Sequence, residues 1–141
     1  RDTLAAHGSP AMTNESVLLH GDYWPGNILW RDGDIAAVLD WEDAAIGDPV
    51  ADLAGSRLEL LWKFGPEVME SFTTHYLSRT TIDLADLPLW ELTSASGAAA
   101  HMSAWGLDAA IEAEMREKAW WFMEQARQRL ATDRSGASKI R

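Results

Sequence analysis

The first third of the chain carries short runs of apolar residues separated by turn-forming residues, a pattern typical of β-strands. Residues 17–19 form one apolar run, and residues 27–30 and 35–39 form two more. The last two runs flank a turn at 31–34, where the Asp32-Gly33 pair tolerates the positive φ angles of a tight turn. The sequence therefore predicts a short strand followed by an antiparallel β-hairpin.

After the hairpin, apolar residues recur at every third or fourth position, which predicts amphipathic helices. Asp48 and Pro49 supply an N-cap carboxylate and a proline suited to the first helical position, so a helix is expected to begin at Pro49. Gly65 and Pro66 should end this helix and begin the next one.

Two longer helices are predicted in the second half, over residues 86–104 and 108–130. Residues 1–15 are rich in turn formers and are interpreted as a linker or loop lead-in, and residues 132–141 as a flexible tail. An isolated hairpin is not stable in water, so the helices must cover it. The predicted fold class is α+β, a small β-hairpin unit packed by about four helices.

Eight tryptophans are an unusual number for 141 residues. Because large aromatic side chains usually fill cores, the five in helical segments are predicted to be packing residues: Trp62, Trp90, Trp105, Trp120 and Trp121. The three nearest the hairpin either shape the wall of a site or are simply buried: Trp24, Trp30 and Trp41.

The net charge of the chain limits the classes of partner that it is expected to bind. Twelve basic and 22 acidic residues give a net charge of −10, which opposes nucleic-acid binding because that requires a positive surface. A cationic substrate suits this charge, although acidity that only maintains solubility explains it as well. No apolar run approaches the roughly 20 residues of a membrane span, so no membrane association is predicted. The chain has no cysteine, which excludes disulfides and thiol chemistry and makes the cytoplasm the expected location.

The polar residues around the hairpin are the candidate chemistry. Asp22 follows the first strand, and a tight loop containing Pro25 and Gly26 leads to Asn27. Antiparallel pairing should bring Asn27, at the start of the hairpin, close to Asp40, just past its end. An amide oxygen and a carboxylate suit Mg²⁺, which takes its remaining oxygens from water and nucleotide phosphates. Asp22 could accept a proton from a substrate hydroxyl.

Glu42 follows Asp40 by two residues and is interpreted either as an additional carboxylate of the site or as a solvated loop residue. Each of these residues is a weak signal in isolation, but their combination is specific.

The block from Val17 to Ala54, with HGDYWPGNILW and LDWEDAAIGDPVADLA, resembles the catalytic half of the aminoglycoside phosphotransferase (APH) family, the kinase-like group that also contains choline kinases. The resemblance implies that residues 16–131 are a fragment of a protein-kinase-like C-terminal lobe. Residues 16–47 would form its catalytic loop and metal-binding hairpin, and residues 48–131 its helical part.

The resemblance also implies roles for individual residues. Asp22 would be the catalytic-loop aspartate near the substrate hydroxyl. Asn27 would bind magnesium, and Asp40 would hold magnesium against the phosphates of ATP or GTP. His20 would support the loop by hydrogen bonding rather than react, and Asp48 would be a structural helix cap.

The sequence departs from the family pattern at its start, because nothing before Val17 contains a Gly-rich phosphate loop or a strand lysine to pair the phosphates. The N-terminal lobe is therefore predicted to be absent and the isolated chain inactive, since ATP would lose half of its phosphate contacts.

Three functions fit these observations. The first is the C-terminal catalytic part of an ATP-dependent phosphotransferase acting on a small hydroxylated molecule. The second is a non-catalytic module, a homodimer in which self-association covers the surface of the missing lobe. The third is a magnesium-dependent phosphohydrolase that uses Asp22, Asn27, Asp40 and Glu42.

Overall fold

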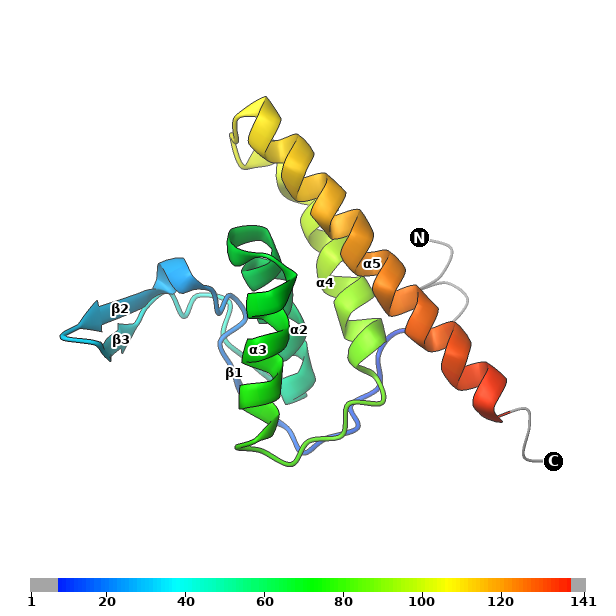
Figure 1. The fold of residues 1–141 in the computed structure, drawn as a ribbon. Helices are drawn as coiled ribbons and strands as arrows, with labels where there is room; N and C mark the ends of the chain where they lie inside the picture. The colour runs from blue at the N-terminus through cyan, green and yellow to red at the C-terminus, as the bar shows by residue number, and fades with distance from the viewer. Residues whose placement is uncertain (1–7, 138–141) are drawn as a thin grey trace. The chain divides into compact units, whose positions relative to one another are not determined.

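The computed structural model describes residues 8–137, which contain four short strands and four α-helices (Figure 1). In chain order the elements are β1 (Val17–Leu19), the 3-10 turn η1 (Pro25–Asn27), β2 (Ile28–Arg31), β3 (Asp34–Val38), β4 (Ala45–Gly47), α2 (Pro49–Phe64), α3 (Pro66–Leu77), α4 (Leu87–His101), the 3-10 turn η2 (Met102–Ala104) and α5 (Ala109–Ala137). Two compact units result: Met12–Leu84 holds all strands with α2 and α3, and the second unit holds α4, η2 and α5. The mixed α/β composition agrees with the predicted fold class.

The predicted β-hairpin is present as β2 and β3, which pair antiparallel. Asp32 and Gly33 form its turn with φ angles of 54° and 90°, the left-handed conformation that an Asp-Gly pair adopts readily. The predicted strand start at Asn27 is wrong, because Asn27 ends the turn η1 and β2 begins at Ile28. The reason is Pro25, which favours a helical turn at this point.

A second small sheet, which the sequence pattern did not reveal, joins β1 to β4. The two strands pair antiparallel, so that Leu19 lies opposite Ala45 and Val17 opposite Gly47. The two ends of the segment 20–44 therefore lie next to each other. This pairing closes the polar motif into one loop at the N-terminal end of α2.

Helix α2 has the boundaries that its capping residues predict. Asp48 accepts a hydrogen bond from the Val50 N–H at 3.0 Å, and Pro49 occupies the first helical position. Gly65 ends the helix with a φ of 88° and is followed directly by α3. The buried face of α2 forms much of the core of its unit: Val50, Leu53, Ala54, Leu58 and Leu61.

The second unit is a helical hairpin of α4 and α5. Phe122 and Ala126 of α5 are buried, and Arg129 forms an ion pair with Glu91 of α4, whose side chain is fully buried. Helix α4 ends at His101 rather than at the predicted residue 104. Helix α5 continues to Ala137, beyond the predicted end at 130, so residues 132–137 of the predicted flexible tail are helical. Residues 138–141 lie outside the described residues. No helix in the described part of the chain is both long and apolar enough to cross a bilayer.

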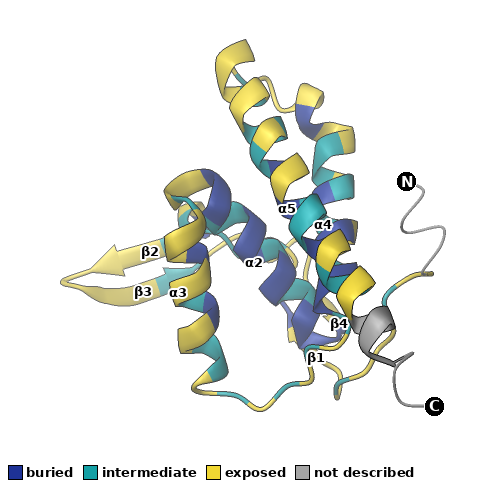
Figure 2. Cartoon of the chain, turned by 45° about the vertical axis from the view of Figure 1, so that its right-hand side comes forward, coloured by how far each residue is buried: buried dark blue, intermediate teal, exposed yellow. Residues whose placement is uncertain are grey.

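The prediction that the helical tryptophans are packing residues is wrong for three of the five. Trp62 is 8% exposed, but Trp105, Trp120 and Trp121 are 45%, 70% and 43% exposed. On α5 the buried positions are Ala119, Phe122 and Ala126, and helical geometry turns positions 120 and 121 away from that face. Figure 2 shows the same alternation of buried and exposed surface along α4 and α5.

Candidate functional site

The loop that carries Asp22 is fixed to α2 through one carboxylate. Oδ2 of Asp52 accepts the His20 N–H at 2.6 Å, and Oδ1 accepts the Gly21 N–H at 3.0 Å. Hydrogen bonds to an ionised carboxylate are among the stronger hydrogen bonds in proteins. Asp52 therefore holds the chain in place directly before Asp22.

His20 connects this loop to the far end of the hairpin. Its side chain is 3% exposed, and Nδ1 accepts the Asp22 N–H at 3.2 Å. The other ring nitrogen, Nε2, lies 2.8 Å from the carbonyl oxygen of Leu39. With Nδ1 as acceptor, Nε2 is the ring nitrogen that donates to the Leu39 carbonyl oxygen. These two bonds connect His20 to the backbone of Asp22 and of Leu39.

Asp22 and Asn27 are hydrogen-bonded to each other. The Asn27 amide nitrogen donates to the backbone oxygen of Asp22 at 3.0 Å and to its carboxylate at 3.1 Å. Asn27 is only 8% exposed, so its amide group has one defined orientation. Because Nδ2 makes both bonds, Oδ1 is the atom that Asn27 can offer to a metal ion.

Asp40 is brought to Asn27 by a backbone contact. The N–H of Leu39, one residue earlier, donates to the Asn27 carbonyl oxygen at 2.8 Å. Asp40 itself has a φ of 63°, a left-handed conformation that is uncommon outside glycine and occurs at functional sites. Its side chain is exposed.

The amide oxygen of Asn27 and the carboxylate of Asp40 fit the needs of Mg²⁺, which binds few protein oxygens when phosphates and water supply the others. Among residues 8–137, no three His, Cys, Asp or Glu side chains are grouped so as to hold a metal ion by themselves. A metal ion bound by Asn27 and Asp40 would therefore need most of its oxygen ligands from phosphate and water.

Two predicted residues remain, Glu42 and Asp48. Glu42 is exposed, in a turn closed by the Ala44 N–H and the Trp41 carbonyl oxygen at 3.1 Å. Asp48 is 1% exposed and accepts hydrogen bonds from Thr13 and Asn14 in addition to Val50. Burial alone would raise the pKa of Asp48, but the hydrogen bonds from Asn14 and Val50 outweigh it and hold the pKa below its ordinary value. Asp48 is a structural residue at the base of the loop.

Glu59 is a residue of the site that sequence reasoning missed. Burial, to which the charge of Asp22 adds, raises the pKa of Glu59 to about 7 against a smaller opposite effect of Lys63. Asp22 therefore has a second carboxyl group nearby that is partly protonated at neutral pH.

Glu59 shares one face of α2 with three residues that interact with the loop 20–24. Asp52 binds His20 and Gly21, Ser56 donates to the Tyr23 carbonyl oxygen at 3.0 Å, and the Lys63 ammonium lies 6.0 Å from the centre of the Trp24 ring. Positions 52, 56, 59 and 63 share one helix face. The loop 20–24 lies along that face. In the sequence, the recurrence of polar residues at every third or fourth position of this helix was the signal that could have identified Glu59.

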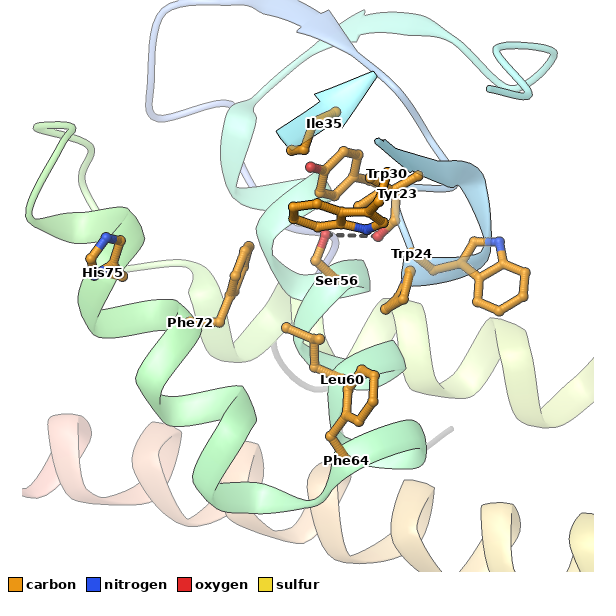
Figure 3. Close-up of a pocket in the computed structure, with 11 residues that line it drawn as sticks. Tyr23, Trp24, Trp30, Ile35, Ser56, Leu60, Phe64, Phe72 and His75 are labelled. Carbon is orange, nitrogen blue, oxygen red and sulfur yellow. Dashed lines mark hydrogen bonds between the residues drawn. The ribbon is translucent and has the colours of Figure 1, made fainter. Parts of the chain in front are cut away.

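An apolar cavity of about 560 Å³ is lined in part by Tyr23 and Trp24 (Figure 3). The catalytic loop, the hairpin, α2 and α3 all contribute to its lining: Tyr23, Trp24, Pro25, Ile28, Trp30, Ile35, Ser56, Leu60, Phe64, Phe72 and His75. Two of the three motif tryptophans, Trp24 and Trp30, thus form walls.

Residues 1–90 match the sequence model of the Phosphotransferase enzyme family, APH. This chain therefore belongs to the APH phosphotransferase family, and the resemblance seen in the motif is confirmed.

Several curated proteins are similar to part of the chain. Viomycin phosphotransferase of Streptomyces vinaceus is 38% identical over 58 residues, which are 38% of this chain and 20% of that protein. Acyl-CoA dehydrogenase family member 11 of Rattus norvegicus is 33% identical over 98 residues, 57% of this chain and 12% of that protein. The Homo sapiens protein of the same name is 42% identical over 55 residues, 38% of this chain and 7% of that protein. The matched segments span at most 20% of these relatives.

Proposed function

We propose that this chain carries the base and the metal ligands of an ATP-dependent phosphotransferase that acts on a small hydroxylated molecule. The observation that carries the proposal is the pair of hydrogen bonds between Asp22 and Asn27, and the backbone bond from Leu39 to Asn27, one residue before Asp40, supports the inclusion of Asp40. Two hydrogen bonds hold this arrangement: Asp52 of α2 accepts the His20 N–H, and the His20 ring bonds to the Leu39 carbonyl oxygen. Phosphoryl transfer depends chiefly on positioning and charge neutralisation, so a fixed constellation of this kind is what the reaction needs.

In this reaction the acceptor hydroxyl oxygen forms a bond to the γ-phosphorus of ATP, and the bond from that phosphorus to the bridging oxygen of ADP breaks. Asp22 takes the proton of the hydroxyl. Asn27 Oδ1 and the Asp40 carboxylate would hold Mg²⁺, which when bound neutralises charge on the nucleotide phosphates. No Gly-rich phosphate loop or lysine precedes Val17 in this sequence, so we expect the 141-residue chain alone to lack turnover.

The acceptor in this proposal is an alcohol of small size. The net charge of −10 favours a cationic acceptor over an anionic one through long-range attraction. Viomycin phosphotransferase acts, by its name, on viomycin, but the match covers 20% of that protein and does not define the acceptor here.

A test joins the N-terminal lobe of viomycin phosphotransferase to this chain and measures ATP consumption with hydroxylated amines. We expect turnover that Asp22→Asn lowers by roughly 10²–10⁴, the usual contribution of a positioned base. Glu67→Gln, on an exposed side chain of α3 that is not a candidate site residue, is the control and should retain the rate. Equal rates for Asp22→Asn and the unsubstituted fusion would refute the assigned base.

The metal ligands can be tested on the 141-residue chain itself. Mn²⁺ with ATP, followed by electron paramagnetic resonance, should bind the unsubstituted chain more tightly than Asn27→Ala or Asp40→Asn, while Glu67→Gln on α3 should match it. Identical affinities in all four proteins would contradict the assignment of Asn27 and Asp40.

A further inference from the structure

The apolar cavity beside the catalytic loop is an elongated groove. Its α2 wall consists of Ser56, Leu60 and Phe64, which are spaced by four residues. At 1.5 Å of rise per residue these positions extend over about 12 Å, or two helical turns. Phe72 and His75 of α3 form the opposite wall, and the hairpin closes one end (Figure 3). We call these residues, with the others that line the cavity, the aromatic groove.

The walls of the aromatic groove are apolar and largely bare. Trp30, Phe64 and Ile35 line it, yet they remain 63%, 52% and 50% exposed. Trp30 and Ile35 are paired across β2 and β3, so they form one continuous strip. A pocket that encloses a small ligand buries most of the ligand surface, whereas open apolar strips of this kind mark contacts with polypeptide.

The lining also lacks charge. It contains no Asp, Glu, Lys or Arg, and the Ser56 hydroxyl is already bonded to the Tyr23 carbonyl oxygen. The polar side-chain atoms of the described lining belong only to Ser56, His75 and the aromatic side chains of Tyr23, Trp24 and Trp30, and the side chains of an apolar helix face need no polar partner. A groove two turns long accommodates a helix whose apolar residues recur at i, i+4 and i+7.

We propose that the aromatic groove binds the apolar face of an amphipathic α-helix that belongs to further polypeptide of a phosphotransferase of family length. The relatives support this source, because the segments that match this chain are only 20% of viomycin phosphotransferase and 12% of the rat protein. Since Tyr23 and Trp24 follow Asp22 directly and line the groove, the docked helix supports the loop that carries Asp22 in addition to Asp52.

The experiment uses the full 141-residue chain and a labelled peptide of about 18 residues, five helical turns, with leucines at i, i+4, i+7 and i+11 and a neutral mixture of Glu, Lys and Ala elsewhere. A second peptide of the same composition has its leucines at every second position. Fluorescence anisotropy should show binding of the first peptide only, and circular dichroism should show that it becomes helical when bound.

Matched substitutions locate the binding. Ile35→Glu should weaken binding of the helical peptide by roughly tenfold or more, the effect of losing one anchoring apolar contact. Ile46 is also an exposed strand isoleucine, 71% exposed on β4, but it does not line the groove, and Ile46→Glu should leave the affinity unchanged. Trp30→Glu and Trp120→Glu form a second pair with the same expectation. All four sites are at least half exposed, and thermal unfolding verifies that each variant is folded.

Each other outcome overturns the proposal. Equal affinity for the two peptides, no binding of either one, or equal effects of Ile35→Glu and Ile46→Glu would show that the groove does not select a helix. A dimer in sedimentation that Ile35→Glu dissociates would assign the groove to a second copy of the chain. Binding of 2-naphthol that Trp30→Glu abolishes, without peptide binding, would assign it to a small molecule. These readouts need no turnover, so the proposed function can fail or hold separately.

Discussion

Gly21 occupies a position that other residues cannot adopt without strain. Its φ is 85°, and a Cβ built at this position would overlap the carbonyl oxygen of Asp43 and lie 2.8 Å from the Asp43 Cβ. Its N–H is one of the two bonds that attach the loop to Asp52. Local conformation and close packing therefore both require glycine directly before Asp22.

We expect Gly21→Ala to lower the free energy of unfolding by about 3 kcal/mol, since a left-handed φ and an overlap with backbone act together. Gly33→Ala is the control, because Gly33 has a φ of 90° but nothing within 4 Å of its Cβ position. It should cost only about 1 kcal/mol. Urea unfolding of both variants measures the difference, and equal losses would show that the contact with Asp43 is not tight.

The ionisation of Glu59 makes the stability of the folded chain depend on pH. Its pKa of about 7 in the folded chain lies above the ordinary value of 4.5, so the folded state binds more protons than the unfolded state between these values. The contribution of the Glu59 carboxyl group to the free energy of unfolding is therefore fully present below pH 4.5. It is lost as the pH rises to 7, and the total loss is on the order of 3 kcal/mol.

Replacing Glu59 with glutamine should remove this dependence, because glutamine is neutral at every pH. The free energy of unfolding of Glu59→Gln is expected to fall less between pH 5 and pH 8 than that of the unsubstituted chain. Urea titrations at several pH values measure both slopes, with Glu42→Gln as the exposed control. Parallel curves for all three proteins would contradict the raised pKa.

Helix α2 organises the site through one face. Its Asp52, Ser56, Glu59 and Lys63 meet successive parts of the loop 20–24, while Leu53, Leu58 and Leu61 are buried. The helix is itself fixed by Asp48 at its start and Gly65 at its end. A single well-capped element thus carries both the core of its unit and the support of the catalytic loop.

Asp52→Ala should remove two charge-assisted hydrogen bonds and leave the N–H of the buried His20 without its partner. We expect a loss of about 2–4 kcal/mol in the free energy of unfolding. Hydrogen exchange should also become faster at the amides of His20 and Gly21. Ser56→Ala, which removes a single neutral bond to Tyr23, should cost about 1 kcal/mol. Unchanged exchange at His20 in Asp52→Ala would show that Asp52 does not hold the loop.

The chain divides into two compact units that contain different parts of the structure. Met12–Leu84 contains every residue of the candidate site, and α4 with α5 forms a helical hairpin fastened by the pair Glu91 and Arg129. The family match reaches residue 90, so it covers the first unit and only the beginning of α4. Stability of the second unit should therefore be separable from the geometry of the site.

Arg129→Met tests this separation, because it deprives the fully buried Glu91 carboxylate of its ion pair and should cost about 3–5 kcal/mol. Hydrogen exchange is expected to accelerate in α4 and α5 and to stay unchanged at His20 and Gly21. Arg127→Met, which breaks only the exposed pair with Glu124, should leave exchange unaltered. Accelerated exchange throughout Met12–Leu84 would show that the two units unfold together.

Local signals in the sequence were sufficient for much of the fold. The Asp32-Gly33 turn, the cap at Asp48 and Pro49 and the break at Gly65 depend on residues that are close in the chain, and each lies where it was predicted. The pairing of β1 with β4 was not predictable in this way, because it joins three-residue strands separated by the whole motif. The exposure of Trp120 and Trp121 was missed because residue type was weighed above helical phase.

The sequence alone determined the family, and residue types at fixed spacings indicated the residues proposed for phosphoryl transfer. Only the tertiary structure decided how those residues are held: that Asp52 binds the backbone before Asp22, that the Asn27 amide nitrogen donates to Asp22, and that the charge of Asp22 acts on Glu59. The bonds of Asp52 and the effect on Glu59 depend on residues far apart in the chain. A carboxylate acquires a support role or a raised pKa from what surrounds it, and the surroundings exist only after folding.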